Sequence, residues 1–209
     1  MNILGFFQRL GRALQLPIAV LPVAALLLRF GQPDLLNVAF IAQAGGAIFD
    51  NLALIFAIGV ASSWSKDSAG AAALAGAVGY FVLTKAMVTI NPEINMGVLA
   101  GIITGLVGGA AYNRWSDIKL PDFLSFFGGK RFVPIATGFF CLVLAAIFGY
   151  VWPPVQHAIH AGGEWIVSAG ALGSGIFGFI NRLLIPTGLH QVLNRSEEHT
   201  SELQSPVPI

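Results

Sequence analysis

Long apolar stretches separated by short polar turns run through most of the sequence, up to about residue 194. A helix of about 20 apolar residues crosses the hydrocarbon core of a bilayer, which is about 30 Å thick. Only 10% of the residues are charged, whereas soluble domains carry about 25%. The mean hydropathy of +0.76 agrees with that deficit. The sequence therefore predicts an all-α, polytopic membrane protein with five to six transmembrane helices in the lipid bilayer.

The predicted spans follow one another through short connections. An amphipathic lead-in over residues 1–12 is expected to lie in the membrane interface. Pro17 and Pro22 should kink the first span because proline removes a backbone donor, and Pro153 and Pro154 should close the fifth. The expected spans are residues 13–30, 44–62, 69–88, 96–112 and 132–151, followed by a sixth helical stretch over residues 164–184.

Lysine and arginine are distributed unevenly between the two sets of connections. Connections that stay in the cytoplasm are enriched in these residues, so the sequence predicts a cytoplasmic N-terminus. The net charge of +1, without a basic stripe, gives no indication of nucleic-acid binding. The cytoplasmic set is Arg9, Arg12, Lys66, Arg114, Lys119, Lys130 and Arg131, and the outer set is Arg29 and Lys85.

The connection over residues 113–131 is the longest polar one and combines charges with aromatic side chains. Such a mixture is typical of a segment on the membrane surface. Its aromatic residues are Trp115, Phe123, Phe126 and Phe127.

Asp50 and Asn51 lie inside the second predicted span. A carboxylate at membrane depth is a candidate functional group. The alternative is that Asp50 lies near an interface and caps a helix that begins at Asn51. The preceding Gly45 and Gly46 suggest a break in the helix, which favours the alternative.

A second polar group occurs at residues 181–194, where Arg182 and His190 flank Pro186 and Gly188. A continuous helix is not expected there, because proline removes a donor and glycine permits unusual dihedrals. A broken segment carrying a guanidinium and an imidazole is what a polar-solute site inside a membrane needs. An interfacial helix end with Arg182 snorkelling to headgroups fits the residues equally well.

No metal site or cofactor is expected. Cys141 is the only cysteine and lies in an apolar run, where it is predicted to be a small buried hydrophobe. His157 and His160 have the spacing of a ligand pair, but without a third ligand the sequence favours a solvated loop.

The last fifteen residues, 195–209, are polar and without periodicity. The stretch 195–206 looks like an in-frame translation of a short-read sequencing adapter. We therefore expect a domain over residues 1–194 followed by an artefactual, disordered tail, with the natural chain interrupted after Asn194. A genuine disordered cytoplasmic tail is the alternative.

Four segments together carry a family likeness: 16–25 (LPIAVLPVAA), 48–60 (IFDNLALIFAIGV), 126–135 (FFGGKRFVPI) and 181–190 (NRLLIPTGLH). Their order and content resemble the glucose-type IIC membrane domain of the bacterial phosphoenolpyruvate-dependent sugar phosphotransferase system. Within it, the chain is most similar to the N-acetylglucosamine-specific branch, and the likeness covers residues 1–194.

The resemblance implies a sugar permease of the bacterial cytoplasmic membrane that phosphorylates its cargo. It implies a homodimer, and a phosphorylated IIB domain recharged by a IIA domain. It places His190 and Arg182 at the site of sugar binding and phosphoryl transfer, and it matches Lys130 and Arg131 to a family segment without giving them a role. The predicted cytoplasmic orientation puts these two cations where a soluble partner can reach them.

The family's Gly-Ile-Thr-Glu motif, the IIB cysteine motif and the IIA histidine do not occur in the sequence. The catalytic residue is therefore not assigned, and the chain alone is expected neither to transport nor to phosphorylate. A non-enzymatic channel or secondary transporter that uses Asp50, Arg182 and His190 as a relay remains the alternative, beside a structural membrane protein that moves no solute.

Overall fold

The computed structural model describes residues 3–32 and 35–168, and these form helices with no strand among them. The all-α prediction is therefore confirmed for this part of the chain. The elements in chain order are α1 (Ile3–Ile18), α2 (Leu21–Gly31), α3 (Ala39–Asp50), α4 (Leu52–Trp64), α5 (Gly70–Ile90), α6 (Val98–Trp115), the 3-10 helices η1 (Asp122–Phe127) and η2 (Gly129–Arg131), and α7 (Phe132–Ser168).

Three helical stretches among the described residues are long and apolar enough to cross a membrane: Leu4–Gly31, Gly70–Ile90 and Gly129–Ile159. The pair α3 and α4 makes a fourth if it is counted as one bent span. These stretches fit a polytopic helical membrane protein. Most of the sixth predicted stretch, residues 164–184, lies outside the described residues.

The first span begins differently from the prediction. The amphipathic helix does not end at residue 12 but continues as α1 to Ile18, and a turn at Ala19 and Val20 separates it from α2. The longer helix is stabilised by Ala13 and Leu14, which are buried against Phe56 of α4 in one hydrophobic cluster. Pro22 lies in the first turn of α2, where a missing N–H costs little.

The second predicted span is not continuous. α3 and α4 meet at Asn51 with a bend of 56°, and α3 packs against α2 rather than continuing toward the core. Gly45 makes this packing possible, since an added Cβ would lie 2.8 Å from the Ala24 carbonyl oxygen. The predicted break at Gly45 and Gly46 was therefore wrong, because these glycines sit inside α3.

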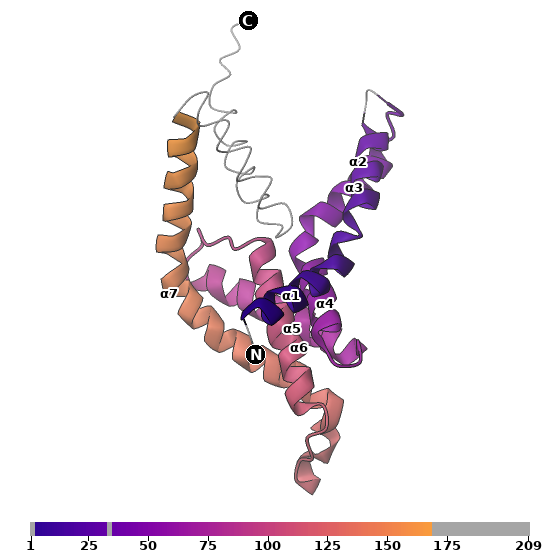
Figure 1. Cartoon of the computed structure of the whole chain (residues 1–209), viewed down its shortest axis with the longest axis vertical. Coiled ribbons are helices and arrows are strands. Elements are labelled where there is room, and N and C mark those ends of the chain that lie inside the picture. Colours follow the sequence, from indigo (N-terminus) through magenta and orange to yellow (C-terminus); the bar gives the residue numbers. More distant parts are fainter. Residues whose placement is uncertain (1–2, 33–34, 169–209) are drawn as a thin grey trace, which may run out of the picture.

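Helix α6 lies at the centre of the core and contacts α4, α5 and α7. Figure 1 shows α5 and α6 in the middle of the molecule, with the α2–α3 pair extending away from them. Small residues permit the close approach of membrane helices. Added Cβ atoms at Gly105 and Gly109 would come within 2.8 Å of Val60 and 2.7 Å of Trp64 on α4.

Helix α7 does not end before Pro153 and Pro154 but runs through both to Ser168. His157 and His160 therefore lie on a helix and not in the predicted loop. Prolines are tolerated in membrane helices because neighbouring helices, hydroxyl side chains, water and small local adjustments satisfy the backbone groups that they leave free. Proline in a helix interior produces a kink, and Figure 1 shows that α7 bends along its length.

Candidate functional site

A polar network gathers at the end of the molecule where α4 turns into α5 and where α6 ends. Its centre is Asp67, in the turn after α4. The Tyr112 hydroxyl of α6 donates a hydrogen bond of 2.9 Å to the Asp67 carboxylate, and the Lys130 ammonium of η2 lies 3.9 Å from the same oxygen. Because Tyr112 is fully buried, its phenol links the core directly to this charged end.

A second ion pair joins the same two segments. Lys66 Nζ lies 2.9 Å from Asp117 Oδ2, and the backbone N–H of Lys66 donates to Asn113 Oδ1 at 2.7 Å. The Lys66 hydrogen bond, followed by one from Ser116, holds the pKa of Asp117 below its usual 3.8. The bond to Asp117 raises the pKa of Lys66 above its usual 10.5. The pair is exposed, so it orders the turn more than it stabilises the fold.

Arg9 connects the N-terminal helix α1 to this network. Its guanidinium lies 4.4 Å from the centre of the Trp64 ring and donates a 2.7 Å hydrogen bond to the Trp64 carbonyl oxygen. The same oxygen accepts a 3.0 Å bond from Asn113 Nδ2. Two donors therefore satisfy the free carbonyl at the end of α4.

The predicted site residues Lys130 and Arg131 are adjacent in η2 and exposed, but they contact different groups. Lys130 lies near Asp67, whereas the Arg131 guanidinium stacks 4.7 Å from the Phe126 ring centre. Arg131 Nη1 also donates to the Phe126 carbonyl oxygen at 3.2 Å. The structure therefore separates two cations that the sequence places together.

The predicted polar pair Asp50 and Asn51 lies at the bend between α3 and α4, and both side chains are exposed. Asp50 is the last residue of α3 rather than a cap, and no side chain caps α4. Asn51 instead donates from Nδ2 to the Ala47 carbonyl oxygen at 2.9 Å. The capping interpretation was therefore wrong, since Asn51 closes the end of α3.

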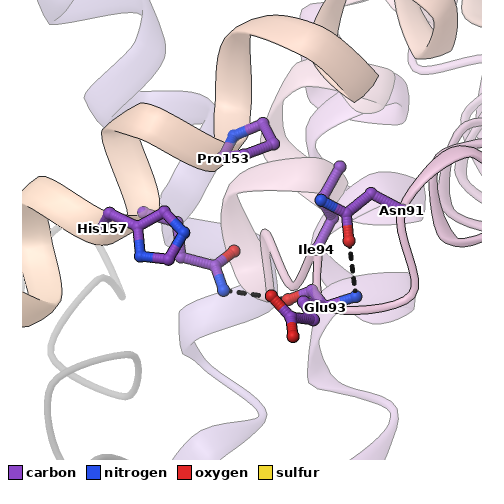
Figure 2. A pocket seen from close by; sticks show the side chains of 6 residues that line it. Asn91, Glu93, Ile94, Pro153 and His157 are labelled. Atoms are coloured by element: carbon purple, nitrogen blue, oxygen red, sulfur yellow. Dashed lines mark hydrogen bonds between the residues drawn. The ribbon is translucent and has the colours of Figure 1, made fainter.

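The other two predicted site residues, Arg182 and His190, lie outside the described residues. His157, which the sequence placed in a loop, lines a small cavity with Asn91, Glu93, Ile94, Pro153 and Gln156 (Figure 2). This cavity is at the other end of α5, and its volume of about 10 Å³ leaves space for no more than one water molecule. It cannot hold a sugar.

Gln156 fastens the turn after α5 to α7 at this opposite end. Its Nε2 donates to the Glu93 carbonyl oxygen at 2.9 Å, and its Oε1 accepts from the Asn95 backbone N–H at 3.1 Å. The sequence patterns indicated neither Gln156 nor the hydrogen-bonded pair of Asp67 and Tyr112 at the opposite end. Their contacts join residues far apart in the chain, and no local pattern marks them.

The fold and these two polar ends define a class: a polytopic helical membrane protein whose charges gather in the connections between its spans. The family model described as "Phosphotransferase system, EIIC" matches residues 11–201. The chain belongs to this EIIC family. The match passes residue 194, and the adapter origin of residues 195–209, which lie outside the described residues, stays a prediction.

Three relatives show to which members of the family the chain is similar. The chain is 95% identical over 194 residues to the N-acetylglucosamine-specific EIICBA component of Klebsiella pneumoniae, covering 93% of this chain and 30% of the relative. It is 54% identical over 191 residues to the N-acetylglucosamine-specific EIICB component of Bacillus subtilis, covering 91% and 42%. It is 40% identical over 210 residues to the N-acetylglucosamine-specific EIIC component of Streptomyces coelicolor, covering 90% and 50%. The chain thus spans half the length of these relatives or less.

Proposed function

We propose that the chain forms part of the membrane permease of an N-acetylglucosamine phosphotransferase system, which couples sugar uptake to phosphorylation. The observation that carries this proposal is the 95% identity over 194 residues to a protein named for that sugar. Glucose is the alternative sugar, because the likeness extends to a glucose-specific EIICBA component, at 40% identity over 228 residues.

The proposed reaction transfers phosphate from a IIB domain, recharged by IIA, to a sugar hydroxyl. Phosphoryl transfer depends mainly on positioning and on stabilising charge. We assign Arg182 to the charge near the incoming phosphate and His190 to a sugar hydroxyl. Asp50 and Asn51 are proposed as polar groups within the membrane that the sugar can meet, since both are exposed at a helix break.

The proposed orientation places the polar network on the cytoplasmic side of the bacterial inner membrane. Support comes from Arg9, Lys66 and Lys130, which meet around the α4–α5 turn and the end of α6. Positively charged connections face the cytoplasm. Lys130 and Arg131 then lie on the side that a soluble IIB domain reaches, and the permease is proposed to act as a homodimer.

The test is uptake of radiolabelled N-acetylglucosamine by cells that lack their own permease and express a full-length parent protein containing this chain. Uptake is expected to require the soluble phosphotransfer proteins, and the cells should accumulate sugar phosphate. His190→Ala or Arg182→Ala in the parent should abolish both, whereas Lys85→Gln serves as a control. Unphosphorylated uptake without phosphotransfer proteins would instead favour a channel or secondary transporter.

The 209-residue chain expressed alone is proposed to be inactive, because it covers only 30% of the EIICBA relative. Restored uptake by this chain alone would contradict that. Sequencing the genomic DNA beyond the Asn194 codon tests the tail: a reading frame that continues with family sequence supports the artefact.

A further inference from the structure

The segment that joins α6 to α7 exposes large apolar side chains outside any helix that spans the membrane. Figure 1 shows it in salmon at the bottom of the view, projecting from the end of α6. Phe123 is 82% exposed and Phe126 68% exposed. Large apolar side chains that are exposed together mark a contact with another protein or with a membrane.

The 3-10 geometry of η1 places its apolar and polar side chains on different sides. Residues three apart lie on one side of a 3-10 helix, which has three residues per turn. Phe123 and Phe126 therefore share one side of η1 (Asp122–Phe127), while Asp122 and Ser125 share another. The segment is amphipathic at this short period, with its carboxylate turned away from the two phenylalanines.

One cation contacts the phenylalanine side, and a second precedes η1 by three residues in the chain. Arg131 stacks on the Phe126 ring at 4.7 Å and uses only one donor on the Phe126 carbonyl oxygen, whereas a guanidinium has five N–H donors. Lys119 is exposed and has no ion pair within residues 3–32 and 35–168. Lys66 and Lys130, by contrast, lie near Asp117 and Asp67.

Helix α7, which follows the segment in the chain, also carries exposed apolar side chains near its start. Ile135, Phe139 and Leu142 are 52%, 66% and 52% exposed, and their spacing places them on one face of the helix. They belong to the apolar stretch Gly129–Ile159, which is long enough to cross a membrane. Arg131 lies at the start of that stretch, at the level where headgroups are expected.

We propose that Lys119 and residues 122–131 form a binding surface for anionic phospholipid. Phe123 and Phe126 insert beside the acyl chains, and Lys119 and Arg131 bind the headgroup phosphate. Arg131 suits this role because its planar fork matches phosphate oxygens. The proposed cytoplasmic orientation decides only which leaflet of the membrane this surface binds. The inference also changes the role proposed for Arg131, which would contact lipid rather than a soluble domain.

The test uses the 209-residue chain with Cys141→Ala and Leu124→Cys, carrying an environment-sensitive fluorophore at position 124 and reconstituted in phosphatidylcholine nanodiscs. Lipids brominated on their acyl chains quench a fluorophore that lies close to them. Dibrominated phosphatidylglycerol at low mole fraction should quench at least about threefold more than dibrominated phosphatidylcholine. Salt at 1 M, where the Debye length falls to about 3 Å, should remove this preference.

Matched variants assign the effect to the surface. The preference should fall toward equal quenching by the two lipids with Lys119→Gln and with Arg131→Gln, because each variant removes one positive charge at the membrane surface. Lys85→Gln, which removes an exposed cation at the far end of α5, should leave it unchanged. Asp122→Asn should strengthen it, and a gain of this kind cannot come from unfolding.

Two results overturn the proposal. Equal quenching by both brominated lipids would mean that the surface touches lipid without selecting a charge. No quenching by either lipid would place residues 122–131 in water, where a soluble protein is the better partner. Neither result would bear on sugar uptake by the parent protein, so the proposed function is tested separately.

Discussion

At the scale of single residues, the turn between α4 and α5 is ordered by partners on α6. Asp67 and Lys66 each contact a residue about fifty positions further along the chain: the Tyr112 hydroxyl in one case and the Asp117 carboxylate in the other. Tyr112 is buried while Asp67 is half exposed. Breaking the bond therefore costs more at the buried Tyr112 hydroxyl, which would lose its acceptor, than at Asp67, which water can still reach.

Tyr112→Phe should lower the free energy of unfolding by about 1 kcal/mol, since a hydrogen bond to a carboxylate is lost while water still solvates Asp67. The measurement is the midpoint of unfolding by sodium dodecyl sulfate in mixed micelles, followed by tryptophan fluorescence. Tyr80→Phe is the control, because no described residue accepts a hydrogen bond from the Tyr80 hydroxyl. An equal loss in both variants would argue against the Asp67 bond.

The Lys66–Asp117 pair makes a prediction about pH. A carboxyl group with a lowered pKa stabilises the folded state above its unfolded pKa, and the contribution disappears as pH falls through the folded pKa. Asp117 should therefore titrate below 3.8 in the folded protein, as measured by NMR of its side-chain carboxyl carbon. Lys66→Gln should move the midpoint up toward 3.8. An unchanged midpoint would mean that the Lys66 hydrogen bond is not formed.

At the scale of helices, glycine decides how closely α4, α5 and α6 approach one another. A methyl group added at Gly101 of α6 would overlap the Ala53 carbonyl oxygen of α4. Nothing lies within 4 Å of a methyl group added at Gly46 of α3. Glycines that look alike in the sequence therefore differ in their structural role.

Gly101→Ala should destabilise the protein by about 1–3 kcal/mol, because backbone on the neighbouring helix cannot move aside without a rearrangement. Gly46→Ala should cause no loss, since alanine has the higher helix propensity and meets no atom. Both variants are measured by the same detergent unfolding as above. A loss at Gly46 as large as that at Gly101 would contradict the close packing of α4 and α6.

At the scale of the whole molecule, α5 separates two polar ends. Lys66 and Asp67 lie in the turn before it, and Glu93, fastened by Gln156, follows it. A helix of 21 residues is about 30 Å long, which matches the hydrocarbon thickness of a bilayer. The two ends should therefore face opposite sides of the membrane.

Single cysteines in a Cys141→Ala background test this arrangement. In intact spheroplasts, a membrane-impermeant maleimide should label Glu93→Cys, and it should label Lys119→Cys only after the cells are permeabilised. The 209-residue chain without substitutions, whose only cysteine is Cys141, should stay unlabelled, since that thiol is buried. Labelling of both positions from one side would exclude α5 as a span.

The sequence by itself determined that the chain is an all-helical membrane protein, approximately where its spans lie, and to which family it belongs. Apolar length, turn residues and ordered motifs are local properties, so they can be read without coordinates. The tertiary structure decided where helices break and which polar groups meet. The bend at Asn51 depends on α3 packing against α2, and α7 continues through Pro153 and Pro154 despite the local signal to stop. Tyr112 meets Asp67 only because α6 runs back along α5 to the turn that precedes α5, and such contacts depend on packing between distant segments rather than on any neighbouring residues.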